Sequence, residues 1–78
     1  MELQMVFASV NFRRLDYNLF DIKPGTEVYG CFNNVDSLIG KVKWPERWGS
    51  YCFIPRITVF NTQYLRDIVV FLEQLNYS

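Results

Sequence analysis

The C-terminal segment is the feature that most constrains the fold of this chain. In residues 60–76, "FNTQYLRDIVVFLEQLN", apolar side chains recur at steps of three and four residues, which is the period of an amphipathic helix. Asn61 or Thr62 can cap the start of this helix, because either side chain can accept a hydrogen bond from a free backbone N–H. The pattern predicts a C-terminal helix that packs on a sheet through its apolar residues, which are Tyr64, Leu65, Ile68, Val69, Phe71, Leu72 and Leu75.

The apolar arc of this helix is wider than one packed face requires. Val70 and Tyr77 fall on the same outward side as Arg66 and Glu73, where a monomeric protein would carry polar side chains. Self-association through Val70, Tyr77 and Arg66 is therefore one hypothesis. A free edge of the sheet is a second route to a homo-oligomer, since exposed edges invite pairing.

Three segments in the middle of the chain have the alternation and turn residues of strands. "TEVYGCF" (26–32) follows the turn "KPG", and "SLIGKVKW" (37–44) and "SYCFIPR" (50–56) are joined through "PERWG". We expect the last of these strands to lie centrally in the sheet, because both of its faces carry large side chains, and to end at Pro55, which cannot donate to a central ladder.

Alternation also assigns the faces of the strand within residues 37–44. If Leu38, Val42 and Trp44 pack against the helix, the intervening side chains point to the other face. The opposite face is then basic, and its residues are Ile39, Lys41 and Lys43.

The N-terminal third is less clearly patterned. "LQMVFASV" (3–10) resembles a strand, whereas "FRRLDYNLFDI" (12–22) fits both an alternating and a helical template, of which we favour strands. The whole pattern predicts an α+β fold for residues 1–78 as a single small domain. This fold is an antiparallel β-meander of three to five strands with one C-terminal helix packed on a face.

Composition excludes several kinds of chemistry. The 78 residues include no histidine, which removes the commonest general base and most transition-metal sites. The acidic residues are scattered, and no glycine-rich phosphate loop is present. Cys31 and Cys52 form no C-x-x-C pair, and two free, buried thiols are favoured over a disulfide. We therefore expect neither an enzyme nor a bound metal or cofactor.

Charge and targeting features limit the partners. Eight basic and eight acidic residues cancel, so no overall field attracts the protein to nucleic acid or to an anionic membrane. The N-terminus has no basic region followed by an apolar run, and no segment has the length of a transmembrane helix. A cytoplasmic location without membrane contact is the expectation.

The turn between the two joined strands is the main candidate binding surface. Interface centres are enriched in Trp, Tyr and Arg, and we predict that a protein partner binds through Arg47, Trp48, Tyr51, Arg56, Lys41 and Lys43. Nucleic-acid binding is the alternative, because residues 37–60 hold four basic residues and one acidic residue, a net charge of +3, and exposed aromatic rings stack on bases. A small-molecule or nucleotide site at an oligomer interface is a third hypothesis.

The run "IGKVKWPERWGSYCFIPR", followed by "YLRDIVVFLEQLN", resembles short uncharacterised proteins encoded by bacteriophages and prophages. These share a glycine-led strand, two tryptophans flanking a turn, an aromatic strand that ends in proline, and a helix that ends in Leu-Asn. The similarity spans residues 39–76. It implies a virus-encoded accessory protein that works in the host cytoplasm by binding and blocking a host protein, including components of defence systems.

Overall fold

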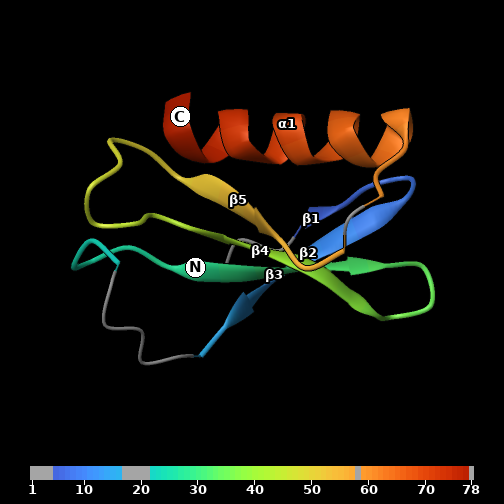
Figure 1. Cartoon of the computed structure of the whole chain (residues 1–78), viewed down its shortest axis with the longest axis horizontal. Coiled ribbons are helices and arrows are strands. Elements are labelled where there is room, and N and C mark those ends of the chain that lie inside the picture. The colour runs from blue at the N-terminus through green and yellow to red at the C-terminus, as the bar shows by residue number, and fades with distance from the viewer. Residues whose placement is uncertain (1–4, 17–21, 58, 78) are drawn as a thin grey trace.

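The computed structural model describes residues 5–16, 22–57 and 59–77. They form one antiparallel sheet, in which the five strands lie in chain order, and one helix. The elements are β1 (Met5–Val6), β2 (Val10–Leu15), β3 (Val28–Asn33), β4 (Leu38–Lys43), β5 (Cys52–Pro55) and α1 (Thr62–Tyr77). The helix lies across one face of the sheet (Figure 1). The predicted α+β meander with a C-terminal helix is confirmed.

The N-terminal strands differ from the prediction in one respect. Residues 5–10, the described part of the strand predicted over residues 3–10, do not form one strand. The chain turns after β1, where the Phe7 N–H donates to the Val10 carbonyl at 2.8 Å. β2 then pairs with β3 along its whole length. Residues 12–15 are therefore strand, which excludes the helical alternative there, whereas residues 17–21 lie outside the described residues.

The core lies between the sheet and α1. The ring of Phe71 stacks on that of Phe12 with a centroid distance of 4.0 Å, and Tyr29 meets Phe71 edge-on at 5.2 Å. Burying a side chain of this size stabilises the fold by about 2–3 kcal/mol. The other buried members of this cluster are Val10, Cys31, Ile39, Val42 and Ile68.

A β-bulge changes the faces predicted for β4. Cys31 pairs with Gly40, but the next residue of β3, Phe32, pairs with Leu38, so Ile39 is an extra residue. Ile39 is consequently buried in the core with Val42. The predicted grouping of Ile39 with the basic side chains was wrong, because a bulge interrupts strict alternation. For the same reason Leu38 does not face the helix as predicted, but pairs with Phe32 and lines a groove on the other face of the sheet.

β5 is an edge strand, not the central strand that was predicted. The cover on its outer side comes from α1: the Asn76 side chain accepts a hydrogen bond from the Tyr51 N–H at 2.7 Å and donates to the Tyr51 carbonyl at 3.2 Å. The strand ends at Pro55 as expected, and this residue has no N–H to offer at the edge. The edge is thus closed at one end by an amide and at the other by a proline.

The helix begins as the sequence predicts. The Tyr64 N–H donates to the Asn61 side-chain oxygen at 2.8 Å, so Asn61 is the cap. A feature that periodicity did not predict is Asp67, which is buried and accepts hydrogen bonds from Ser9 and Gln63. Within the described residues, no helix has the length and apolar character needed to cross a membrane.

Candidate functional site

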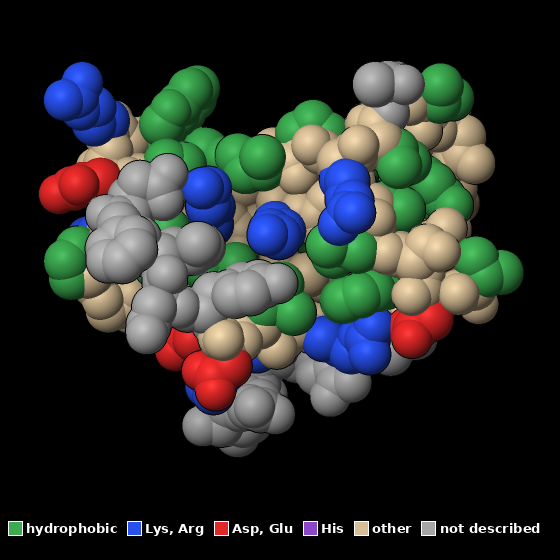
Figure 2. All heavy atoms as spheres, turned by 60° about the horizontal axis from the view of Figure 1, so that its bottom comes forward, with side chains coloured by type: hydrophobic (Ala, Val, Ile, Leu, Met, Phe, Trp, Pro, Cys, Tyr) green, Lys and Arg blue, Asp and Glu red, His purple; other side chains and the backbone are tan. Residues whose placement is uncertain are grey.

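The face of the sheet opposite α1 carries a row of side chains from different strands. Arg13 pairs with Gly30, Gly30 with Lys41, and Lys41 with Ile54. Paired residues project to the same face, and the neighbouring residues Phe12 and Val42 are in the core under α1, so this row faces away from the helix. We call this surface the open face. Figure 2 shows Lys and Arg side chains spread across it, with hydrophobic side chains between them.

The clearest hollow on the open face is a groove between β4 and β5. Ile54 is 40% exposed there, and the Arg56 N–H donates to the Ile39 carbonyl at 2.8 Å, which fixes the chain where it leaves β5. The aliphatic side chain of Ile54 lies in this groove with the cations Lys41 and Arg56. A partner could place an apolar group on Ile54 and a neighbouring anionic group beside the cations. The groove is lined by Leu38, Gly40, Lys41, Ile54, Pro55 and Arg56.

The β4–β5 turn presents the second exposed feature. The Trp48 N–H donates to the Pro45 carbonyl at 3.0 Å, which closes a tight turn, and the Trp48 side chain is 64% exposed. Pro45, Glu46, Arg47 and Trp48 surround a shallow hollow. Trp and Arg are two of the three residue types that are enriched at the energetic centres of protein interfaces.

Trp44, in contrast, is a structural residue of the hairpin. Its ring meets Tyr51 edge-on at 5.4 Å, and the Lys23 ammonium lies 4.3 Å from its ring centroid. The Lys23 N–H also donates to the Trp44 carbonyl at 2.9 Å. This arrangement agrees with the expectation that Trp44 shares the packed face with Val42.

The structure divides the six residues predicted to bind a partner into three places. Lys41 and Lys43 are half-buried on the open face, Arg56 lies at the end of the groove, and Arg47 and Trp48 are exposed at the turn.

Tyr51 is the member that the structure separates from the others. Its ring lies on the helix side of the sheet, 6.4 Å from that of Tyr29, and its hydroxyl accepts a hydrogen bond from the Glu27 N–H at 3.3 Å. The Tyr51 ring is therefore part of the packing beneath α1. The binding surface that the other five residues can form does not include it.

Sequence reasoning missed the contribution of β2 and β3 to the open face. The Arg13 guanidinium lies 3.7 Å from the centroid of the Phe32 ring and pairs with Asp36 at 2.7 Å. The Phe32 ring in turn covers Gly30, where an added Cβ would lie 2.7 Å from Phe32 Cε2. This layer depends on cross-strand register, for which the sequence of a single strand carries no signal.

The two cysteines lie on opposite faces and are both free. Cys31 lies opposite Phe12 of the neighbouring strand and is buried in the core. Cys52 lies opposite Lys43 and is half-buried on the open face. Burial, with a smaller contribution from the charge of Asp67, raises the pKa of the Cys31 thiol to about 12. Cys31 is thus an inert core thiol.

The open face therefore offers a surface for binding. Among residues 5–16, 22–57 and 59–77, no group of three or more Cys, Asp or Glu side chains is placed to hold a metal ion. The open face supplies cations and aliphatic groups, which suit an acidic partner with an apolar anchor. Comparisons of the chain with protein-family models, with curated proteins and with solved structures found no match.

Proposed function

We propose that this protein is a non-enzymatic binding module that recognises an acidic protein surface through the β4–β5 groove and the β4–β5 turn. The observation that carries the proposal is the exposure of Trp48 and Ile54 beside cations on a surface that α1 leaves uncovered. The resemblance to phage-encoded proteins supports a host protein as the partner, whose activity the contact would block.

The charges around this surface favour an acidic partner. Lys41 and Arg56 line the groove, Arg47 lies beside Trp48, and Glu46 is the single acidic residue that lines either hollow. Complementary charge speeds association and selects against basic partners. The aliphatic side chain of Ile54 and the Trp48 ring provide the apolar contacts that sustain the complex.

A protein partner is favoured over a single-stranded nucleic acid because other side chains cover most of the aromatic rings near the candidate site. Proteins that bind single strands stack successive bases on exposed rings. On the open face the Phe32 ring is covered by Arg13. The Trp44 ring lies on the packed face, where Tyr51 and Lys23 contact it. Trp48 alone would not form a stacking platform.

The test is capture from a host lysate by immobilised wild-type protein and by the Arg47→Ala, Trp48→Ala double variant. Val35→Ala is the matched control, because Val35 is an exposed apolar residue in the turn between β3 and β4. We expect a partner that wild type and Val35→Ala retain and that the double variant loses. Equal retention by all three proteins would remove the turn from the interface.

A second measurement separates the two classes of partner. Anisotropy of labelled single-stranded and duplex DNA is recorded with the protein at low and high salt. We expect no binding at either salt concentration. Binding that weakens steeply with salt, and that Lys41→Glu with Arg56→Glu abolishes, would instead establish a nucleic-acid-binding module.

A further inference from the structure

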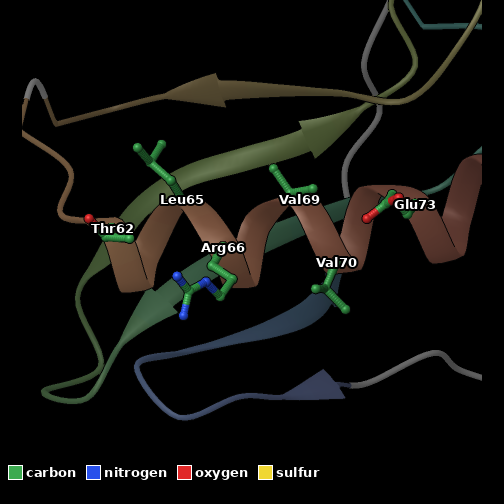
Figure 3. A pocket seen from close by; sticks show the side chains of 6 residues that line it. All are labelled: Thr62, Leu65, Arg66, Val69, Val70 and Glu73. Atoms are coloured by element: carbon green, nitrogen blue, oxygen red, sulfur yellow. The ribbon is translucent and has the colours of Figure 1, made fainter.

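The outer surface of α1 carries an apolar stripe with a charge at each end. Leu65 and Val69 are each 51% exposed and Tyr77 is 83% exposed, although all three belong to a helix that already packs on the sheet through its other side. Figure 3 shows Leu65 and Val69 on one side of the helix axis and Arg66 and Val70 on the other. The stripe is lined by Thr62, Leu65, Arg66, Val69, Val70 and Glu73.

The positions of the two charges are the informative feature. Arg66 precedes the valine pair Val69–Val70 by three residues, and Glu73 follows it by three. Within residues 5–16, 22–57 and 59–77, the structure gives neither charged side chain an ion-pair partner. The stripe is therefore self-complementary about its own centre.

We infer that a second copy of this chain covers the stripe, with the two helices antiparallel and related by a two-fold axis between Val69 and Val70. In this arrangement Arg66 faces the partner's Glu73, and the same pair recurs on the other side of the axis, as two-fold symmetry requires. Thr62 then faces the partner's Tyr77. A parallel pair would instead place Arg66 beside the partner's Arg66, where like charges repel.

The spacing of the stripe suits such a contact. Residues 62, 66, 69, 73 and 77 of α1 follow one another at steps of four, three, four and four. They therefore form one strip along the outer surface of the helix, as a seam between two helices requires. The 16 residues of α1 give a contact about 24 Å long. This is at the small end of protein interfaces, so the dimer is expected to be weak and dependent on concentration.

The first test is a charge swap followed by analytical ultracentrifugation over a wide range of concentration. Arg66→Glu alone and Glu73→Arg alone each replace two attractive pairs with two repulsive ones. We expect each to weaken dimerisation by about tenfold or more, and the double variant Arg66→Glu, Glu73→Arg to restore it. Both side chains are exposed, so we expect each variant to fold, and far-ultraviolet circular dichroism checks this.

The second test fixes the orientation with a short bismaleimide in a Cys52→Ala background. Val70→Cys places a thiol beside the axis and is expected to cross-link. Thr62→Cys is expected not to cross-link. Position 62 faces the partner's Tyr77, and the partner's own position 62 lies 15 residues further along its helix, about 22 Å away.

Several results would overturn this inference. They are a monomer at every concentration, a double variant that does not recover, or cross-linking through position 62. The helix and the open face lie on opposite sides of the sheet (Figure 1), so this test can fail while the proposed partner binding succeeds, and the reverse also holds.

Discussion

The side-chain amide of Asn76, in the last turn of α1, bonds both backbone groups of Tyr51 immediately before β5. One amide therefore replaces the two hydrogen bonds that a neighbouring strand would make. Arg56 bonds towards β4, and backbone direction alternates along an antiparallel strand. Three residues thus turn their backbone groups to the outer edge, namely Tyr51, Phe53 and Pro55. With Tyr51 bonded to Asn76 and Pro55 without an N–H, Phe53 alone retains a pair for strand addition.

Asn76→Ala should open this edge. We expect a loss of about 1–2 kcal/mol in the free energy of unfolding, because two hydrogen bonds to a part-buried backbone are removed. The Tyr51 amide proton should exchange faster with solvent, and the variant should aggregate more readily. Gln74→Ala is the control, since Gln74 is exposed two residues earlier in the same helix. Unchanged exchange at Tyr51 would contradict this assignment.

Asp67→Ala should be among the most destabilising substitutions in α1. Asp67 is 5% exposed, and its carboxylate accepts hydrogen bonds from the Ser9 hydroxyl at 2.6 Å, the Ser9 N–H at 3.2 Å and the Gln63 amide at 2.8 Å. Removing it leaves these donors unpaired, with an expected cost of about 2–4 kcal/mol in urea unfolding. Ser9→Ala, which keeps the backbone bond, should cost about half as much. A change for Asp67→Ala within about 0.5 kcal/mol of wild type would refute the role of this contact.

Gly40→Ala should distort the hairpin that forms the groove. An added Cβ would lie 2.7 Å from Phe53 Cε1 and 2.8 Å from the Ile54 carbonyl oxygen, so a ring and a backbone must both shift. We expect a loss of about 1–3 kcal/mol in thermal or urea unfolding. Gly49→Ala is the matched control, because nothing lies within 4 Å of its added Cβ. Equal stability of the two variants would show that the Phe53 ring moves freely.

The Cys31 thiol should make the protein less stable in alkali. Burial raises its pKa to about 12 in the folded protein from an ordinary value of 9.0, so the unfolded chain loses this proton first. The free energy of unfolding should therefore fall as pH rises between these two values, by at most about 1.4 kcal/mol per pH unit, and should be unaffected by this group below pH 9.0.

Cys31→Ala isolates this effect from that of Tyr29. The pKa of Tyr29 is also raised from 10.0, first by burial and then by the charges of Tyr51 and Glu27, and it contributes a slope of the same sign. Urea unfolding at several pH values should give a shallower alkaline slope for Cys31→Ala than for wild type. Parallel slopes would show that Cys31 ionises normally in the fold.

The sequence allowed the elements of this fold to be predicted where their causes are local. The helix follows from its period and from the Asn61 cap, and the end of β5 follows from Pro55. The placement of β5 in the sheet was wrong because its large side chains on both faces suggested neighbouring strands on both sides. Its outer side is instead bonded by Asn76, which is 25 residues away from Tyr51 in the chain.

The sequence predicted which basic residues belong to the candidate site, but it did not predict how the strands arrange them. Lys41 and Lys43 lie on the face that alternation predicts, because the bulge at Ile39 comes before them in β4 and does not change their register. Arg13 and Ile54 join the same row only through the pairing of four strands. Neither residue has a local sequence pattern that indicates this cross-strand contact. Tyr51 was included because its residue type is enriched at interface centres, which says nothing about the face on which it lies.

The two-layer architecture has a consequence for how many targets one assembly can hold. The sheet separates the outer stripe of α1 from the open face (Figure 1), so a pair of chains joined through their helices would turn two identical open faces in opposite directions. Such a pair could not close both faces over a single small target. It would bridge two separate molecules or two sites on a repetitive one, and attachment at the first site would raise the effective concentration at the second.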